Sequence, residues 1–285
     1  MMFWKVLGAE HVKLFKRNIL WIEMGLLALS VAALYLVAFA VLLGGSSGVM
    51  APEAIESGLT WPTGLTGALS FAAGPNLGGL LMIVLVGAAV AQEYTWGTMQ
   101  LWLSRGIPRP LLMAVKFAAL LIPAALLVLT ALFTGGLISG AFSLHFLGSI
   151  PFNQVAWGQL AWSVLVFVYS LLPYAALTFF LAVASRSTVV SIGGGLAYAL
   201  LLEGIGLQLI GALGGIWGEI GRYLPGGLAR GMLQLNSGMR VEIDGEAVEA
   251  IQFLDSGTAA IGIALYVIVF VIGAILIFRR QDLSA

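Results

Sequence analysis

Six long apolar stretches constrain this chain more than any other feature of its sequence. A helix needs about 20 apolar residues to cross the hydrocarbon core of a bilayer, because the core is about 30 Å thick and each residue rises about 1.5 Å. The stretches of this length lie near 19–43, 71–91, 111–134, 160–183, 188–210 and 259–278. They are continuous rather than alternating, which favours helices over transmembrane strands. We therefore expect an all-α integral membrane protein with six transmembrane helices in one domain over 1–285.

The composition supports a membrane protein and argues against several other classes. Hydrophobic residues make up 60% of the 285 positions and charged residues only 9%, whereas about a quarter of a soluble domain is charged. Thirteen acidic residues balance thirteen basic ones, so the net charge gives no reason to expect a nucleic-acid partner. The chain has no cysteine, and His11 and His145 are far apart. We therefore expect no metal site.

The segment before the first apolar stretch predicts an amphipathic helix over 2–18. Apolar side chains fall on one side of a helical wheel and lysines on the other. The apolar side includes Phe3, Trp4, Leu7, Leu14 and Phe15, and the basic side includes Lys13 and Lys16. Such a helix lies at the membrane interface. A plain basic flank that orients the first span is the alternative, and the two interpretations are compatible.

The stretch 92–116, QEYTWGTMQLWLSRGIPRPLLMAVK, is the most polar connection between two apolar stretches. If 92–105 is one continuous helix, the spacing of Glu93, Gly97, Gln100 and Ser104 gives it a polar stripe beside a broad apolar surface. Pro108 and Pro110 then end the helix, and the chain returns to the third span through Lys116. We expect a loop over 92–110 that contains a short interfacial helix and a hinge.

The distribution of basic residues predicts the orientation. Ten of the thirteen fall on one side of the predicted spans: Lys5, Lys13, Lys16, Arg17, Arg105, Arg109, Lys116, Arg186, Arg279 and Arg280. Cytoplasmic loops carry an excess of Lys and Arg. Both termini and the loop 92–110 should therefore be cytoplasmic, and the Gly-rich segment 211–258 should be extracytoplasmic or re-entrant.

Several catalytic signatures are missing from the sequence. No lysine precedes Ser or Thr, so the chain has no G-x-x-x-x-G-K-[ST] phosphate-binding loop. It has no H-E-x-x-H motif, and no predicted span combines a Ser-His pair or paired carboxylates at matching depth. Hydrolysis within the membrane would need such groups. We expect that the chain is not an enzyme.

The loop and its surroundings resemble the type 2 ABC transporter permeases, the membrane subunits of bacterial six-span ABC exporters. The resemblance lies in a basic amphipathic start, six spans, a long outer segment before the last span and a terminal F-R-R-Q-D sequence. Its most specific part is a series of loop residues: Glu93, Tyr94, Gly97, Thr98, Leu103, Ser104, Arg105, Pro108, Arg109 and Lys116. It covers essentially the whole chain.

The resemblance implies a function for the loop. In that family this loop is a coupling helix, which docks on a separate ATP-binding cassette subunit, and the N-terminal helix touches the same subunit. Carried over, the coupling positions are Glu93, Tyr94, Gly97, Thr98 and Arg105, with Arg109 and Lys116 anchoring the return. ATP and Mg²⁺ would bind to the partner and not to this chain. The alternative is that these residues are ordinary interfacial anchors.

The resemblance further implies an exporter in a bacterial or archaeal plasma membrane, built from two copies of the chain or from the chain and a sibling. Substrate would pass through the dimer interface. An ion-gradient-driven secondary carrier is one alternative, although such carriers usually place charges near the midplane. The other alternative is a membrane-embedded enzyme or assembly factor that uses His145 and the acidic residues of the outer segments. The sequence does not identify the substrate.

Overall fold

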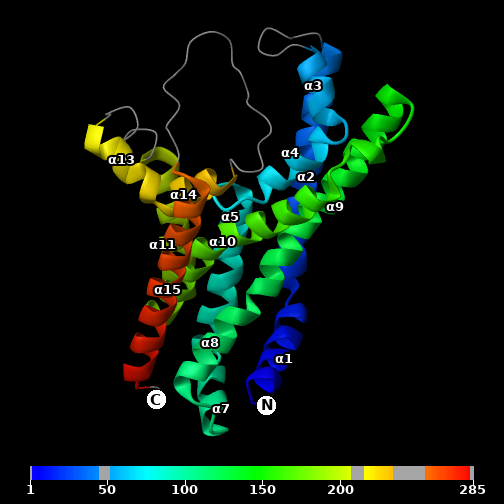
Figure 1. The fold of residues 1–285 in the computed structure, drawn as a ribbon. Helices are drawn as coiled ribbons and strands as arrows, with labels where there is room; N and C mark the ends of the chain where they lie inside the picture. The colour runs from blue at the N-terminus through cyan, green and yellow to red at the C-terminus, as the bar shows by residue number, and fades with distance from the viewer. Residues whose placement is uncertain (1, 45–51, 207–214, 234–253, 283–285) are drawn as a thin grey trace.

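The computed structural model describes residues 2–44, 52–206, 215–233 and 254–282, and within these ranges every regular element is a helix. The helices form an elongated bundle (Figure 1). Both termini lie at one end, together with α1 (Met2–Phe15) and α7 (Thr98–Ser104). We call this the basic end. The opposite end carries α3 (Pro52–Leu59), the last turns of α9 (Leu121–Leu147) and α13 (Gly215–Tyr223).

In the described residues, six helical rods are long and apolar enough to cross a membrane, as the sequence predicts. Three consist of a single helix: α2 (Asn18–Gly44), α10 (Trp157–Ser185) and α15 (Ser256–Arg280). The second rod, Leu77–Thr95, joins α5 (Leu77–Val86), η1 (Gly87–Ala91) and α6 (Gln92–Thr95). The third rod, Arg109–Leu147, joins α8 (Arg109–Ala119) to α9, and the fifth, Thr188–Gly206, joins α11 (Thr188–Ala197) to η3 (Tyr198–Gly206).

Two rods differ from their predicted bounds. The second begins at Leu77 and not near 71, because α4 (Thr63–Phe71) ends there and the chain turns through 72–76. The third continues to Leu147 instead of ending near 134. Gly135 lies inside α9, where a Cβ atom would come within 2.1 Å of the Cβ of Ala68 in α4. The glycine therefore marks a close approach of two helices and not a helix end.

The helix α10 lies at the centre of the bundle and packs against α5, α9, α11 and α15. Its side chains Tyr174 and Phe179 are fully buried, and Pro173 lies inside the helix without ending it. The hydroxyl of Ser170 accepts a hydrogen bond of 3.0 Å from the backbone N–H of Gly74. This contact fixes the turn that precedes the second rod to the central helix.

The predicted N-terminal helix is present as α1, which packs against α8. Its buried residues are Val6, Glu10 and Leu14. On the predicted apolar side, Phe3 and Leu7 contact the core of the bundle, whereas Trp4 and Phe15 are exposed. The buried side of α1 thus overlaps the predicted apolar side at Phe3, Leu7 and Leu14, and it also includes an acidic residue, Glu10, that finds basic partners inside the protein.

The predicted segment 211–258 is described in part. It forms α13 and α14 (Pro225–Leu233), and α14 packs against α10 and α15. Residues 211–214 and 234–253 of this segment lie outside the described residues. The packing of α14 brings the N-terminus of a short helix against the inside of the bundle.

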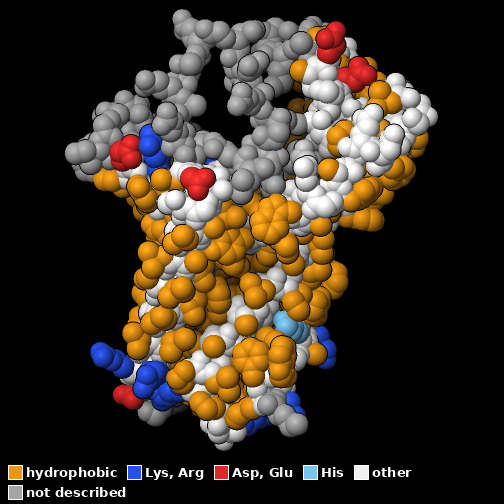
Figure 2. All heavy atoms as spheres, viewed as in Figure 1, with side chains coloured by type: hydrophobic (Ala, Val, Ile, Leu, Met, Phe, Trp, Pro, Cys, Tyr) orange, Lys and Arg blue, Asp and Glu red, His pale blue; other side chains and the backbone are white. Residues whose placement is uncertain are grey.

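Side chains of different types separate along the bundle. Figure 2 shows a belt of hydrophobic side chains around the middle of one face, with Lys and Arg gathered mainly below it at the basic end and most Asp and Glu above it. Exposed large apolar residues include Leu29 in α2, Phe133 in α9 and Leu265 in α15. Such a belt would be unfavourable in water and is typical of helices that lie in an apolar solvent.

The close approach at Gly135 gives a first prediction. Gly135→Ala places a methyl group where Ala68 already lies, so we expect a loss of about 1–3 kcal/mol from overpacking. Gly25→Ala in α2 is the matched control, because a Cβ there meets no atom within 4 Å and alanine favours a helix. The thermal unfolding midpoint of the purified protein measures both. Equal midpoints for the two variants would contradict the close packing of α4 on α9.

Candidate functional site

The polar stretch after the second apolar rod forms two short helices and not one. Residues 92–95 complete the second rod as α6, the chain turns at Trp96 and Gly97, and α7 begins at Thr98. Gly97 has φ of 65°, a left-handed conformation that glycine adopts without strain. The continuous helix over 92–105 that would give a single polar stripe is therefore not formed, whereas a short helix, α7, is present within 92–110 as expected. Because of the break at Gly97, Glu93 and the residues on α7 face different directions.

The segment that leads from α7 into the third rod also differs from the prediction in one detail. A second left-handed glycine, Gly106, follows α7, and Pro108 precedes the first residue of α8. Pro110 lies in the first turn of α8, where proline needs no hydrogen-bond partner for its nitrogen. It therefore helps to begin a helix, whereas the sequence suggested that it ends one.

Four charged side chains form a closed ring at the basic end. The ammonium nitrogen of Lys13 lies 2.8 Å from a carboxylate oxygen of Glu10 and 2.5 Å from one of Glu93. The ammonium nitrogen of Lys116 lies 2.8 Å from the other oxygen of Glu10 and 2.6 Å from the other oxygen of Glu93. Each carboxylate thus contacts both ammonium groups. We call these four residues the charge ring.

The charge ring is almost entirely shielded from solvent. Glu10, Glu93 and Lys116 are each no more than 3% exposed, and Lys13 is partly exposed. Burial alone would lower the pKa of Lys13, but the carboxylates of Glu93 and Glu10 more than compensate and raise it above the usual lysine value. Two acids and two bases cancel, so the ring carries no net charge. Mutual pairing is what makes four buried charges tolerable.

Arg17 extends the ring on one side. Its guanidinium lies 3.9 Å from a carboxylate oxygen of Glu93 and donates a hydrogen bond of 2.8 Å to the carbonyl of Ala88 in η1. The same group stacks over the ring of Trp96, 5.1 Å from its centroid. Arg17 thereby connects the start of α2 to two parts of the second rod and to the turn before α7.

The ring joins three segments that are far apart in the sequence. Glu10 and Lys13 belong to α1, Glu93 ends the second rod and Lys116 lies near the start of the third rod. Removing one member of a buried ion pair typically costs about 3–5 kcal/mol, because the remaining charge loses its partner in a poorly solvated place. A displacement of any one segment would therefore move the other two or break strong contacts.

The C-terminal end of α15 packs against the same region. Arg109 donates hydrogen bonds to the carbonyls of Arg279, at 2.9 Å, and Gln281, at 2.8 Å. A cation at this position satisfies carbonyls that the end of a helix leaves unpaired. The buried amide of Gln281 donates to the carbonyl of Val183, and its oxygen accepts from the hydroxyl of Tyr94.

The exposed surface of the loop is α7 with its two flanking turns. Trp96 is 60% exposed and Leu101 54%, and Gly97, Ser104, Arg105 and Gly106 are exposed beside them. The guanidinium of Arg105 lies 5.9 Å from the centroid of the Trp102 ring. In Figure 1, α7 is the lowest part of the bundle. We call this apolar and basic surface the α7 tip.

The seven loop residues predicted to act together fall into three groups. Glu93 and Lys116 are buried in the charge ring, and the hydroxyl of Thr98 donates to Glu93. Tyr94 and Arg109 contact the C-terminal end of α15. Only Gly97 and Arg105 lie on the exposed tip. The seven residues therefore do not form one surface.

Two residues of this region were not predicted from the sequence. Glu10 was missed, although an acid three residues before Lys13 on an otherwise basic segment was the available signal, because helical residues at this spacing are neighbours. Gln281 was missed because nothing in its local sequence indicates that it would be buried between α10, α15 and Tyr94.

Comparison with known families identifies the sequence family of the chain but no activity. A family model described as a protein of unknown function, DUF2705, matches residues 76–284. The chain belongs to the DUF2705 family. The DUF2705 match includes Glu93 and Lys116 of the charge ring but begins after α1. No curated protein matches the chain.

The charge ring gives the second prediction. Lys116→Met leaves Glu10 and Glu93 with one ammonium group between them, so we expect a loss of about 3–5 kcal/mol in folding stability. Lys5→Met in α1 is the control, because Lys5 is exposed and surface changes are usually within about 0.5 kcal/mol. The thermal unfolding midpoint of each variant in detergent measures the change in stability.

A double variant separates the ring from a general effect of burial. Glu93→Gln combined with Lys116→Met removes one charge of each sign, so the combined loss should be smaller than the sum of the single losses. Strict additivity would contradict a direct interaction between the two side chains.

Proposed function

We propose that this protein is the membrane-embedded permease subunit of an ATP-driven ABC transporter, an exporter, and that the α7 tip receives a separate ATP-binding subunit. The proposal rests on one set of contacts that connects the exposed loop to the long helices. An exposed, short helix lies between the second and third rods, and the charge ring ties both rods and α1 together directly behind it. Such an arrangement transmits a push on α7 into two long helices.

The six apolar rods and the apolar belt support insertion in a bilayer. The concentration of Lys and Arg at the basic end supports a cytoplasmic location for this end, because cytoplasmic segments are rich in these residues. Both termini and the α7 tip would then face the cytoplasm, where ATP is available. The membrane in question would be the plasma membrane of a bacterium or archaeon.

The energy source would lie in the partner. No lysine of this chain precedes Ser or Thr, so the common phosphate-binding loop is missing from its sequence. A partner that binds ATP and Mg²⁺ would close on itself, displace α7 and tilt the second and third rods as one body. The ring keeps α1 and the two rods in register during this motion. The residues of the chain transmit the movement and do not take part in hydrolysis.

A second copy of the chain or a sibling would complete the pathway. Three rods, α2, α11–η3 and α15, expose most of their apolar surface in the single chain. In the most apolar 18-residue stretch of each, only 17% is buried. A bilayer covers such faces, and helix packing between two subunits covers part of them. Substrate would then cross at the interface between two subunits, which open alternately to either side.

Transport driven by an ion gradient is the second candidate, and two buried carboxylates favour it. Glu23 in α2 is buried and neither of its oxygens has a hydrogen-bond partner in the described part of the protein. Glu203 in the fifth rod is buried as well. Ionisable groups inside apolar helices are typical of ion pathways. Transport by purified vesicles with an ion gradient and no ATP-binding subunit would favour this candidate.

A substitution on the tip tests the proposed docking. Leu101→Glu places a charge on an exposed apolar position of α7, so we expect at least a tenfold loss in co-purification of the ATP-binding subunit, about 1.4 kcal/mol or more. Leu147→Glu is the matched control, since Leu147 is 52% exposed and ends α9 at the opposite end of the bundle. Unchanged thermal unfolding of both variants shows that they are folded.

The same two variants measure coupling in vesicles that contain the partner. Leu101→Glu should abolish stimulation of the partner's ATPase activity, and Leu147→Glu should retain it. Equal association and equal ATPase activity for both variants would show that the α7 tip is not the docking surface.

A further inference from the structure

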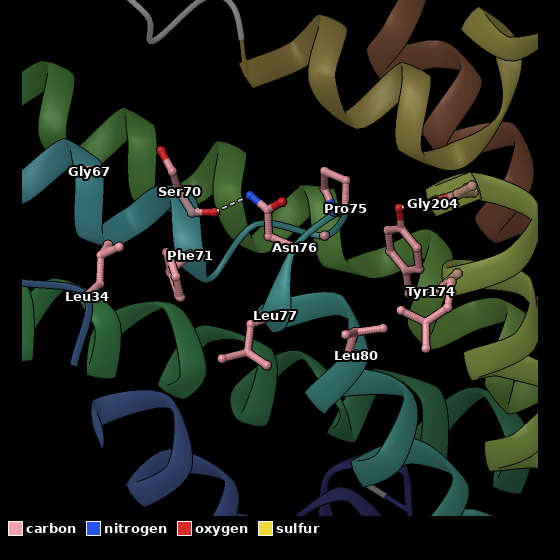
Figure 3. A pocket seen from close by; sticks show the side chains of 14 residues that line it. Leu34, Gly67, Ser70, Phe71, Pro75, Asn76, Leu77, Leu80, Tyr174 and Gly204 are labelled. Atoms are coloured by element: carbon pink, nitrogen blue, oxygen red, sulfur yellow. Dashed lines mark hydrogen bonds between the residues drawn. The ribbon is translucent and has the colours of Figure 1, made fainter. Parts of the chain in front are cut away.

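A cavity of about 550 Å³ opens between the turn that precedes the second rod, α10 and the fifth rod. Figure 3 shows side chains from these elements converging on it. Most of its lining is apolar, including Leu34, Phe71, Leu77 and Leu80. The cavity uses none of the charge-ring residues. It lies nearer the end of the bundle opposite to the α7 tip, where η3 follows α11.

One wall of the cavity is polar and contains a carboxylate. Tyr174 and Glu203 line it together, and the hydroxyl of Tyr174 donates a hydrogen bond of 2.5 Å to Glu203. The other carboxylate oxygen accepts a hydrogen bond of 2.9 Å from the backbone N–H of Gly226, at the start of α14. Glu203 is therefore held in one orientation from two sides.

The backbone around this carboxylate is shaped to bring it inward. Glu203 belongs to η3, a π-helical segment, and such wide turns are frequent at functional sites. A Cβ at Gly226 would lie 2.6 Å from an oxygen of Glu203, so only glycine allows this approach. The α14 helix, α10 and the fifth rod thus all contribute to the position of one acidic side chain.

Glu203 has hydrogen bonds but no basic partner in the described part of the protein. Ion pairs within 4 Å occur there around Glu93 and Glu10 and between Arg222 and Glu219, and none involves Glu203. Arg230 in α14 is exposed and acts on Glu203 only at longer range. A buried carboxylate without a cation is costly, and a cationic group that enters the cavity removes this cost.

We propose that this cavity binds a lipophilic cation, a molecule with an apolar body and one ammonium-like or phosphonium-like charge. The charge would lie beside the carboxylate of Glu203, and the apolar body would contact Leu34, Phe71, Leu77 and Leu80. The chemistry of the lining decides the class: one acidic group and several apolar side chains complement a cation better than an anion or a sugar. This inference goes beyond the proposed function and holds whichever energy source drives transport.

A simpler role for Glu203 is to cap α14, because its carboxylate accepts the N–H of Gly226. The substitution Glu203→Gln distinguishes the two roles. The glutamine oxygen retains an acceptor for Gly226, so the cap survives, whereas the negative charge is lost. A cap alone would give no charge-dependent binding in the cavity.

The probes are tetraphenylphosphonium and tetraphenylborate, which have the same shape and opposite charge. Their binding is measured to wild-type protein and to Glu203→Gln in lipid nanodiscs, with empty nanodiscs as the background. We expect the variant to lose at least about tenfold in affinity for the phosphonium. Its affinity for the borate should stay equal or rise.

A second variant keeps the test decisive if Glu203→Gln does not fold. Asn76 is an exposed residue of the cavity lining, and Asn76→Lys supplies a cation from the protein itself. Its affinity for the phosphonium should fall and its affinity for the borate should rise. The proposal is overturned if phosphonium binding equals that of empty nanodiscs, if it is unchanged in both variants, or if both probes change in the same direction.

Discussion

The mutual pairing of Glu10, Lys13, Glu93 and Lys116 is the interaction on which the basic end of this protein depends. Each of these charges would be unfavourable in so buried a place on its own, and each becomes acceptable only because two opposite charges contact it. These contacts form only where α1, the end of the second rod and the start of the third rod meet at one point. Apolar packing alone would allow these helices to slide, because it has little directional preference.

The same contacts fix the segments on both sides of α7. The α7 tip is exposed, yet the residues on either side of it are fixed: Glu93 and Lys116 by the ring, and Arg109 by the C-terminal end of α15. Glycines at 97 and 106 confine the sharp turns to the ends of α7. The proposed coupling to an ATP-binding subunit would use these contacts, because they connect the segments beside the tip to long helices.

Much of the fold could be predicted from the sequence, because length and hydropathy alone limit the structure of an apolar chain. The six rods follow from continuous apolar runs, and helix α1 follows from its pattern. Local geometry was harder to predict. The chain breaks at Gly97 because glycine tolerates a left-handed turn there, whereas the periodicity of the neighbouring residues favoured a continuous helix. The third rod shows the opposite error: it was predicted to end near 134, but it continues to Leu147 through Gly135, where α4 comes close.

The sequence singles out the stretch 92–116 as a candidate site but does not predict how its side chains pair. Glu93 was expected to face a partner protein, and it faces two lysines instead, one of them in a helix 80 residues away in the sequence. Such tertiary pairing leaves no local pattern. The contacts of Gln281 and the meeting of Tyr174 with Glu203 depend in the same way on helices that only the fold brings together. The residues that contact a partner are better sought on the exposed tip than inside the ring.

Site-directed cross-linking tests the central claim most directly, because the chain contains no cysteine and a single introduced thiol is therefore unique. A cysteine at Leu101 is labelled with a photoactivated cross-linker in native membranes, and a cysteine at Leu147 serves as the reference. The account predicts that an ATP-binding cassette subunit is attached to the first position and not to the second. Attachment of no ATP-binding subunit at Leu101, or equal attachment at both positions, would contradict it.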